Sequence, residues 1–406
     1  MSASGTKQSQ RPPWILGITN IRGGGSKKAI SHANLKGKEH LRCLELWFVE
    51  EDYEGKGDDD ASAIELLEPH PNLEVLLISD YGCSKFPIWM EFQSSSIMLR
   101  GLEILDCRNL EVLPHLSMLE SLQSLFLDGL DSMSPKGFFN GLEASTTTVA
   151  YPNLKIFTIK DMKHWEKWLM ETSSEDINVM PLLRDLYILN CPMLKSVPHQ
   201  ILSQSVRKLF IKNCTELTIS WLPPLLEEFI LDGDGGSLSR SLPFKNNTSL
   251  KILYIQLSPH STLPHGLSQL KALQTLEVVE CKSLMCIPDE LQHLTSLREL
   301  YITQCPILGP CCKKDHLTSL QELYITRCPL LKPRCNKKGE DWSIKSHIPN
   351  IESSPLPQGL SQLEALQTLR ILKSNSRLIT LQRRIAASNL TSGIAYLTVS
   401  YLGSTL

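Results

Sequence analysis

Apolar residues recur along the chain in a twelve-residue phrase in which they are interleaved with polar positions. The phrase is clearest in three successive copies, which read LQTLEVVECKSL from Leu273, LRELYITQCPIL from Leu297 and LQELYITRCPLL from Leu320. The copies begin 24 and then 23 residues apart, and each has the form L-x-x-L-x-[IV]-x-x-C-x-x-L. Five slots filled in register at a nearly fixed period predict a solenoid in which each copy adds one coil.

The phrase is that of a leucine-rich repeat with cysteine in its ninth slot. The two leucines and the sixth-slot aliphatic residue are expected to lie along a short strand with their side chains inward, because alternate residues of a strand point to opposite faces. Strands of successive coils then pair in parallel, with right-handed crossovers. We predict the α/β class: a leucine-rich-repeat solenoid (horseshoe) with a concave parallel β-sheet and an irregular or short helical convex side.

The same frame extends over most of the chain with irregular spacing. Earlier phrases begin at Leu41, Leu73, Leu99, Leu122, Leu154, Leu183, Val206, Leu226 and Leu250, and one later phrase begins at Leu366. This pattern predicts a disordered N-terminus, a truncated first repeat with a lead-in helix, an array of about 12 to 13 repeats, and degenerate C-terminal repeats or a cap. These segments cover residues 1–12, 13–40, 41–351 and 352–406.

Composition and charge limit the classes of partner that the chain is expected to bind. The 406 residues are 42% hydrophobic and 21% charged, with a formal net charge of −2. This balance gives no global attraction to nucleic acid or to an anionic membrane surface. The sequence contains no apolar run of about 18 residues, the length that would predict a membrane span. Its polar start, MSASGTKQSQRPP, lacks the apolar core of a secretory signal. We expect a cytoplasmic protein with protein partners, no nucleic acid and no membrane insertion.

Twelve cysteines raise the question of disulfides or zinc. Six of them occupy the ninth slot of the phrase: Cys107, Cys191, Cys214, Cys281, Cys305 and Cys328. Small buried thiols suit an inward slot, and in a cytoplasmic chain we expect the ladder to be reduced. The best zinc candidate matches no spacing of known zinc motifs, so no metal site is predicted; it consists of Cys305, Cys311, Cys312, His316 and Cys328.

No pattern typical of catalysis is present. The sequence contains no H-E-x-x-H, no G-x-S-x-G and no complete phosphate-binding loop; the glycine run at 23–25 is followed by Ser26 and Lys27 and is read as a flexible connection. We therefore predict no enzyme activity, no catalytic residue and no cofactor in this chain.

The variable strand positions are the predicted protein-binding surface, because their side chains face the concave side. The fifth slot is aromatic in six phrases: Phe126, Tyr187, Phe210, Tyr254, Tyr301 and Tyr324. Strands about 4.8 Å apart would align these rings into a stripe. The charged residues around it are Arg184, Arg207, Lys208, Glu227, Glu228, Lys251, Arg298, Glu299, Glu322 and Arg327. Rigid aromatics among mixed charges are typical anchors of protein interfaces, although aromatics also suit strand surfaces without any partner.

Punctuation between the phrases resembles one protein family. The segments that carry the resemblance are Ala33–Lys38, Glu68–Leu73, Phe86–Met90, Tyr151–Leu154 with Trp165, Leu317–Leu320, and Arg334–Pro349 with its Gly339-Glu340-Asp341-Trp342. They are similar to segments of plant coiled-coil, nucleotide-binding, leucine-rich-repeat (NLR) disease resistance proteins, over roughly residues 15–351. The resemblance implies a sensing surface for pathogen effectors or a guarded host protein, or a contact with an NLR nucleotide-binding domain.

The resemblance has two departures. The family's nucleotide-binding domain is not in this sequence, so ADP or ATP would belong to that missing domain. The chain also continues some 55 residues past His347-Ile348-Pro349, where such arrays usually end; a truncated gene model is one reading. Two alternatives stay open: part of an ADP/ATP-dependent NLR switch if an upstream nucleotide-binding domain exists, and the repeat region of a ubiquitin-ligase substrate adaptor.

Overall fold

The computed structural model divides into two compact units, Met1–Ser353 and Ser354–Leu406, and all residues that it describes belong to the first. They are residues 12–21, 33–49, 63–91, 98–116, 119–134, 149–168, 178–202, 205–243, 249–309, 319–330 and 350–352. The predicted phrase at Leu366, the disordered N-terminal segment up to residue 11, and Cys311, Cys312 and His316 of the zinc candidate lie outside the described residues.

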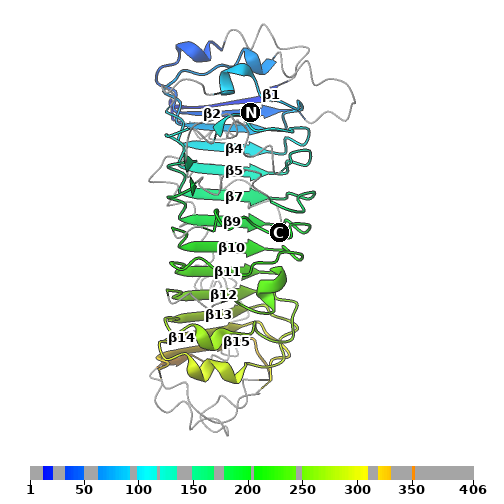
Figure 1. The fold of residues 1–406 in the computed structure, drawn as a ribbon, viewed down its shortest axis with the longest axis vertical. Helices are drawn as coiled ribbons and strands as arrows, with labels where there is room; N and C mark the ends of the chain where they lie inside the picture. Colours follow the sequence, from blue (N-terminus) through cyan, green and yellow to red (C-terminus); the bar gives the residue numbers. More distant parts are fainter. Residues whose placement is uncertain are drawn as a thin grey trace, which may run out of the picture. The chain divides into compact units, whose positions relative to one another are not determined.

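One long parallel sheet carries a strand from every coil of the array (Figure 1). Its fourteen strands follow chain order, and only β6 and β8 are skipped. The strands are β1 (Ile15–Ile21), β2 (Cys43–Phe48), β3 (Val75–Ser79), β4 (Gly101–Leu105), β5 (Ser124–Asp128), β7 (Ile156–Lys160), β9 (Asp185–Leu189), β10 (Lys208–Lys212), β11 (Glu228–Asp232), β12 (Ile252–Gln256), β13 (Thr275–Val279), β14 (Glu299–Thr303), β15 (Glu322–Thr326) and β16 (Asn350–Glu352).

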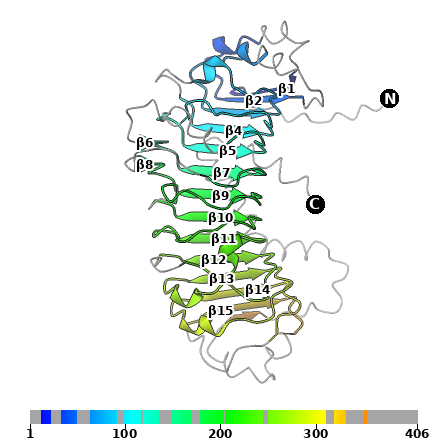
Figure 2. The same cartoon turned by 45° about the vertical axis from the view of Figure 1, so that its right-hand side comes forward.

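The return legs are irregular, with short 3-10 helices in place of regular α-helices. These are η1 (Leu35–Gly37), η2 (Ile88–Glu91), η5 (Gly236–Ser239), η6 (Leu267–Gln269) and η7 (Asp289–His293). A second, two-stranded sheet pairs β6 (Val149–Ala150) with β8 (Asn178–Val179), apart from the main sheet (Figure 2). This arrangement confirms the predicted leucine-rich-repeat solenoid with a parallel sheet and an irregular or short helical second side.

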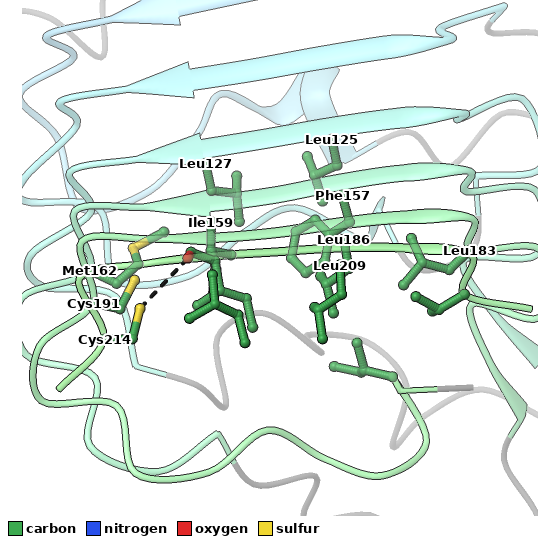
Figure 3. Packing of buried hydrophobic residues seen from close by; sticks show 14 of the residues in the cluster. Leu125, Leu127, Phe157, Ile159, Met162, Leu183, Leu186, Cys191, Leu209 and Cys214 are labelled. Atoms are coloured by element: carbon green, nitrogen blue, oxygen red, sulfur yellow. Dashed lines mark hydrogen bonds between the residues drawn. The ribbon is translucent and has the colours of Figure 1, made fainter. Parts of the chain in front are cut away.

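The core is a stack of equivalent side chains, one set from each coil. Leu276, Leu300 and Leu323 are register partners in β13, β14 and β15, and each is buried. Figure 3 shows the same stacking earlier in the array, where Leu125, Phe157, Leu186 and Leu209 lie one above another. All belong to one continuous hydrophobic cluster, so each coil depends on its neighbours for burial, as the repeat pattern requires.

The ninth-slot cysteines are buried at the turn that follows each strand. All six are at most 1% exposed, and all nine cysteines in the described part of the chain are free thiols. Each Sγ donates to the carbonyl oxygen two residues earlier, as in Cys214 to Lys212 (3.2 Å) and Cys107 to Leu105 (3.3 Å). A thiol is a weak donor that packs like a small hydrophobe, so cysteine fills the turn and adds a second hydrogen bond to a carbonyl that already accepts a backbone N–H, as Lys212 O does from Asn190 N at 2.7 Å.

The residue before the ninth slot takes a left-handed conformation in eleven successive coils. Asp80, Asp106, Gly129, Asp161, Asn190, Asn213, Gly233, Leu257, Glu280, Gln304 and Arg327 all have φ between 49° and 75°. Asp, Asn and Gly tolerate this region best, which explains their frequency at this position. At Gly233 the need is also steric, because a Cβ there would lie 2.0 Å from Oδ1 of Asn213.

Candidate functional site: the outward face of the sheet

Parallel register places the fifth-slot residues in one row across the sheet, here called the central row. It runs Gly17, Glu45, Leu77, Glu103, Phe126, Thr158, Tyr187, Phe210, Ile230, Tyr254, Glu277, Tyr301, Tyr324 and Glu352. All six predicted aromatic residues belong to it. Their alignment follows from the uniform register, since no described pairing from β2 onward shifts by a residue.

The rings do not form the continuous stripe expected from the sequence. Thr158, Ile230 and Glu277 occupy intervening strands, so Phe126 and Tyr254 stand alone. Two neighbouring pairs remain. The ring centroids of Tyr187 and Phe210 are 6.1 Å apart in an edge-on arrangement, and those of Tyr301 and Tyr324 are 6.0 Å apart and tilted by 46°. Both separations suit favourable aromatic contact.

Burial separates these two pairs. Tyr187 is only 4% exposed, and desolvation raises the pKa of its hydroxyl well above the usual value. It was predicted as a binding anchor, but its position between Thr158 and Phe210 in the packed row leaves little of the ring accessible. Tyr301 and Tyr324 are both partly exposed, and the Tyr301 hydroxyl donates to Oε2 of Glu322 at 3.2 Å. The accessible aromatic pair therefore lies on β14 and β15.

The single rings differ as well. Tyr254 is partly exposed and donates its hydroxyl to Oε1 of Gln256 at 2.8 Å. Burial, and then the nearby carboxylates led by Glu277, raise the pKa of Tyr254. Phe126 is also partly exposed. Phe210 is partly exposed too, so the central row offers partly exposed rings at β5, β10, β12, β14 and β15.

The predicted charged residues fall on three rows rather than around one stripe. Those immediately before the strands are Arg184, Arg207, Glu227, Lys251 and Arg298; those at the first strand position are Lys208, Glu228, Glu299 and Glu322; and Arg327 follows β15.

Several of these charges are held by one another. Arg207 and Lys251 both bind Glu227, the latter at 2.9 Å, and the hydrogen bond from Lys251 lowers the pKa of Glu227. Lys208 was predicted as an exposed contact, but it is 9% exposed and binds Glu228 at 3.1 Å. These ion pairs join residues of neighbouring coils, at the distance of directly opposed residues on adjacent strands.

Two desolvated carboxylates on this face are not visible from the sequence pattern. Burial, reinforced by Glu45, raises the pKa of Glu103 to about 7. Burial also raises the pKa of Asp128 to about 6, although Lys160 donates to it at 2.8 Å. Glu103 occupies slot five and Asp128 slot seven of their phrases, outward positions where a charged residue is expected to be solvated. A comparison of these two slots across all phrases is the one sequence signal that could have pointed to them.

Other kinds of site find no support in the described part of the chain. Among the described residues, no group of three or more His, Cys, Asp or Glu is arranged to hold a metal ion. No helix in the described ranges is long and apolar enough to cross a membrane.

Comparison with known proteins agrees with the architecture. Residues 12–130 match the family model described as R13L1/DRL21 LRRs. The chain is 26% identical over 290 residues to putative disease resistance RPP13-like protein 1 of Arabidopsis thaliana, covering 68% of this chain and 25% of that protein. It is 32% identical over 225 residues to putative disease resistance protein RGA1 of Solanum bulbocastanum, covering 55% and 22%. The chain is therefore similar to parts of plant disease resistance proteins, and its own fold is that of a leucine-rich repeat.

This leucine-rich-repeat region spans about a quarter of the length of the curated relatives that it matches. Among solved structures, it is similar to an LRR protein of Leptospira interrogans, at 17% identity and a TM-score of 0.37 over 83% of this chain and 89% of that one. It is also similar to a chain of the Toll–Spatzle complex of Drosophila, at 15% identity and a TM-score of 0.45 over 85% and 47%. Repeat regions of this fold are typically non-catalytic interaction modules.

Proposed function

We propose that the outward sheet face is the recognition surface of a plant innate-immunity module, which binds a pathogen effector or a guarded host protein in the cytoplasm. The proposed role is non-catalytic and uses no cofactor within this chain. An NLR nucleotide-binding domain is the other partner that the family resemblance implies. The observation that carries the proposal is the accessible Tyr301–Tyr324 pair on a rigid strand frame.

The pair has the features of an interface anchor. Tyrosine brings a large apolar ring and a polar tip while losing little rotamer freedom on binding. Tyr301 is already oriented by its hydrogen bond to Glu322, so its side chain loses less conformational freedom when a partner docks. Neighbouring hydroxyl and carboxylate groups on β13–β15, such as Thr275 and Glu299 (3.1 Å), supply the polar rim expected around such an anchor.

The test is effector capture in a binary interaction screen, followed by affinity measurement on purified partners. The variant Tyr301→Ala with Tyr324→Ala is expected to weaken binding at least about thirtyfold, the effect of losing one hot-spot residue of about 2 kcal/mol. The variant Tyr301→Phe with Tyr324→Phe keeps both rings and is expected to bind within a few fold of the unmodified chain.

A matched control uses exposed apolar side chains on the return legs. Ile88 is 81% exposed in η2 and Met285 is 59% exposed after β13. Their replacement by alanine should leave binding unchanged. If the two tyrosines can be removed without loss of affinity while the control weakens it, the recognition surface is not the sheet face.

A further inference from the structure

The second slot of the repeat phrase forms its own row, immediately before the strands. In this row the backbone N–H of each residue donates to the carbonyl oxygen of its predecessor, at 2.7 to 2.9 Å throughout. This unbroken chain, here called the strand-start ladder, consists of Arg42, Glu74, Arg100, Gln123, Lys155, Arg184, Arg207, Glu227, Lys251, Gln274, Arg298 and Gln321.

The strand-start ladder is strongly cationic in a chain whose net charge is −2. Seven of its twelve residues are Arg or Lys and two are Glu. Their side chains are accessible: Arg184 is 71%, Lys251 is 50% and Arg207 is 48% exposed. With strands about 4.8 Å apart, the ladder extends for roughly 50 Å across the N-terminal ends of the strands.

Its two carboxylates each serve two flanking cations. Glu74 lies 3.5 Å from both Arg42 and Arg100, and Glu227 binds Arg207 and Lys251. Each grouping sets one carboxylate against two cations, so one excess positive charge remains at β2–β4 and one at β10–β12.

The cations of the ladder outside these two groupings are Lys155, Arg184 and Arg298, and the first two lie in the successive coils that precede Arg207. Lys155 donates to the neutral amide of Gln123 at 3.3 Å, and the carboxylate nearest Arg184 is Asp185 at 3.8 Å. Farther along, Arg298 has no ion-pair partner among the described residues. Like charges on adjacent strands are destabilising, and nothing in the fold requires cations here, because the ladder bonds are made by the backbone.

We propose that the strand-start ladder, centred on Lys155, Arg184 and Arg207, binds an acidic polypeptide segment of the partner, laid across the strand starts. This inference rests on the proposed function, since it assigns a chemistry to part of the partner that docks on the sheet. The coil spacing suits such a ligand: carboxylates three or four residues apart on one helix face are about 5–6 Å apart, close to the spacing of successive coils.

The surroundings of the ladder favour protein over nucleic acid. The first strand position beside it carries Asp185, Glu228, Glu299 and Glu322, and the one cation there, Lys208, is paired with Glu228. The unpaired positive charge is therefore confined to a single strip. One acidic stripe fits this strip, whereas a phosphate backbone would meet the neighbouring carboxylates. The ladder itself contains no aromatic residue, and sequence-independent binding of single strands relies on aromatic stacking.

The test uses a fluorescently labelled helical peptide of alternating Glu-rich and Ala-rich turns, with binding followed by anisotropy. The variant Lys155→Glu with Arg184→Glu is expected to bind it at least about tenfold more weakly, because close interfacial charge pairs couple by more than 1 kcal/mol. The variant Lys155→Gln with Arg184→Gln should give an intermediate loss, and binding by the unmodified chain should fall as salt screens the charges.

A matched control makes the same change in net charge on the turn that follows β7. Lys163 and Lys167 are both exposed there, and their replacement by Glu is expected to leave peptide affinity within about threefold. Circular dichroism checks that every variant keeps its fold.

Three results of the peptide assay would overturn the proposal. They are no binding of the peptide at low salt, an equal loss in the Lys163 and Lys167 variant, or tighter ladder-dependent binding of a single-stranded oligonucleotide of equal charge. The peptide lacks aromatic residues, so the Tyr301 and Tyr324 variant should still bind it. Effector capture that survives charge reversal at the ladder refutes this inference while leaving the proposed function standing.

Discussion

Gly236 is the position where one added methyl group should most clearly damage the stacking of coils. It begins η5 with φ of 66°. A Cβ at this position would meet the backbone of Leu217 in the preceding coil, at 2.1 Å from its O, 2.8 Å from its N and 2.9 Å from its C. Backbone atoms cannot swing aside as a side chain can, so Gly236→Ala must displace one coil from the other.

The magnitude follows from two contributions. A left-handed conformation costs a non-glycine residue about 1–2 kcal/mol, and forcing an extra carbon into a packed site costs about 1–3 kcal/mol. The hydrogen bond from Ser237 N to Leu217 O, 2.8 Å long, is the first contact to be strained. We expect Gly236→Ala to lower the free energy of unfolding by about 2–5 kcal/mol.

Gly309→Ala is the matched control. Its Cβ would meet only the carbonyl oxygen of Met285, at an ordinary 3.7 Å. Both substitutions restrict the unfolded chain equally, so that effect cancels when the two variants are compared. Urea unfolding followed by circular dichroism measures the difference. Equal midpoints with equal slopes for the two variants would refute the reasoning.

Three further outcomes are expected. Trp165, fully buried with its Nε1 donating to Met133 O at 2.6 Å, should cost about 3–5 kcal/mol when replaced by alanine, measured by the same urea unfolding. The pKa of Glu103 is about 7 against 4.5 for an exposed glutamate, so the native state holds more protons between these values; stability should fall as pH rises from about 4.5 past 7, and Glu103→Gln should remove this slope from the thermal midpoint. Mass-spectrometric alkylation should label Cys191 and Cys214 only after denaturation, because both are fully buried; rapid labelling of the native protein would contradict this.

The sequence predicts the frame of the array well because the frame depends on short-range repetition. Every phrase predicted between Leu41 and Leu320 has its strand, including the one at Leu154, where Met162 takes the ninth slot (Figure 3). Inward residues are defined by period and apolarity, and both are visible in one dimension.

Accessibility on the outward face could not be predicted in the same way. Tyr187 and Tyr301 occupy the same slot of the same phrase, yet Tyr187 is buried and Tyr301 is partly exposed. The difference arises from the neighbouring strands, where Thr158 and Phe210 flank one ring and Glu277 and Tyr324 flank the other. Cross-strand neighbours lie about 20 to 30 residues apart in sequence, so a row must be assembled before its gaps appear.

The strand-start ladder could not be predicted from the sequence either, because it too depends on the register of neighbouring strands. Arg184, Arg207, Lys251 and Arg298 were each predicted to lie on the binding face, among acids and aromatics. Only the register separates them into a row of their own and brings Lys155 beside Arg184. Individual charges were visible in the sequence, whereas their segregation was not.

Footprinting of a captured complex tests the central claim most directly. Hydroxyl-radical labelling of the chain, alone and with a bound effector or host partner, should show reduced modification of Tyr301 and Tyr324. Ile88 and Met285, exposed on the return legs, should be modified equally in both states. Protection of Met285 or Ile88 with unchanged labelling of the two tyrosines would contradict recognition through the sheet face.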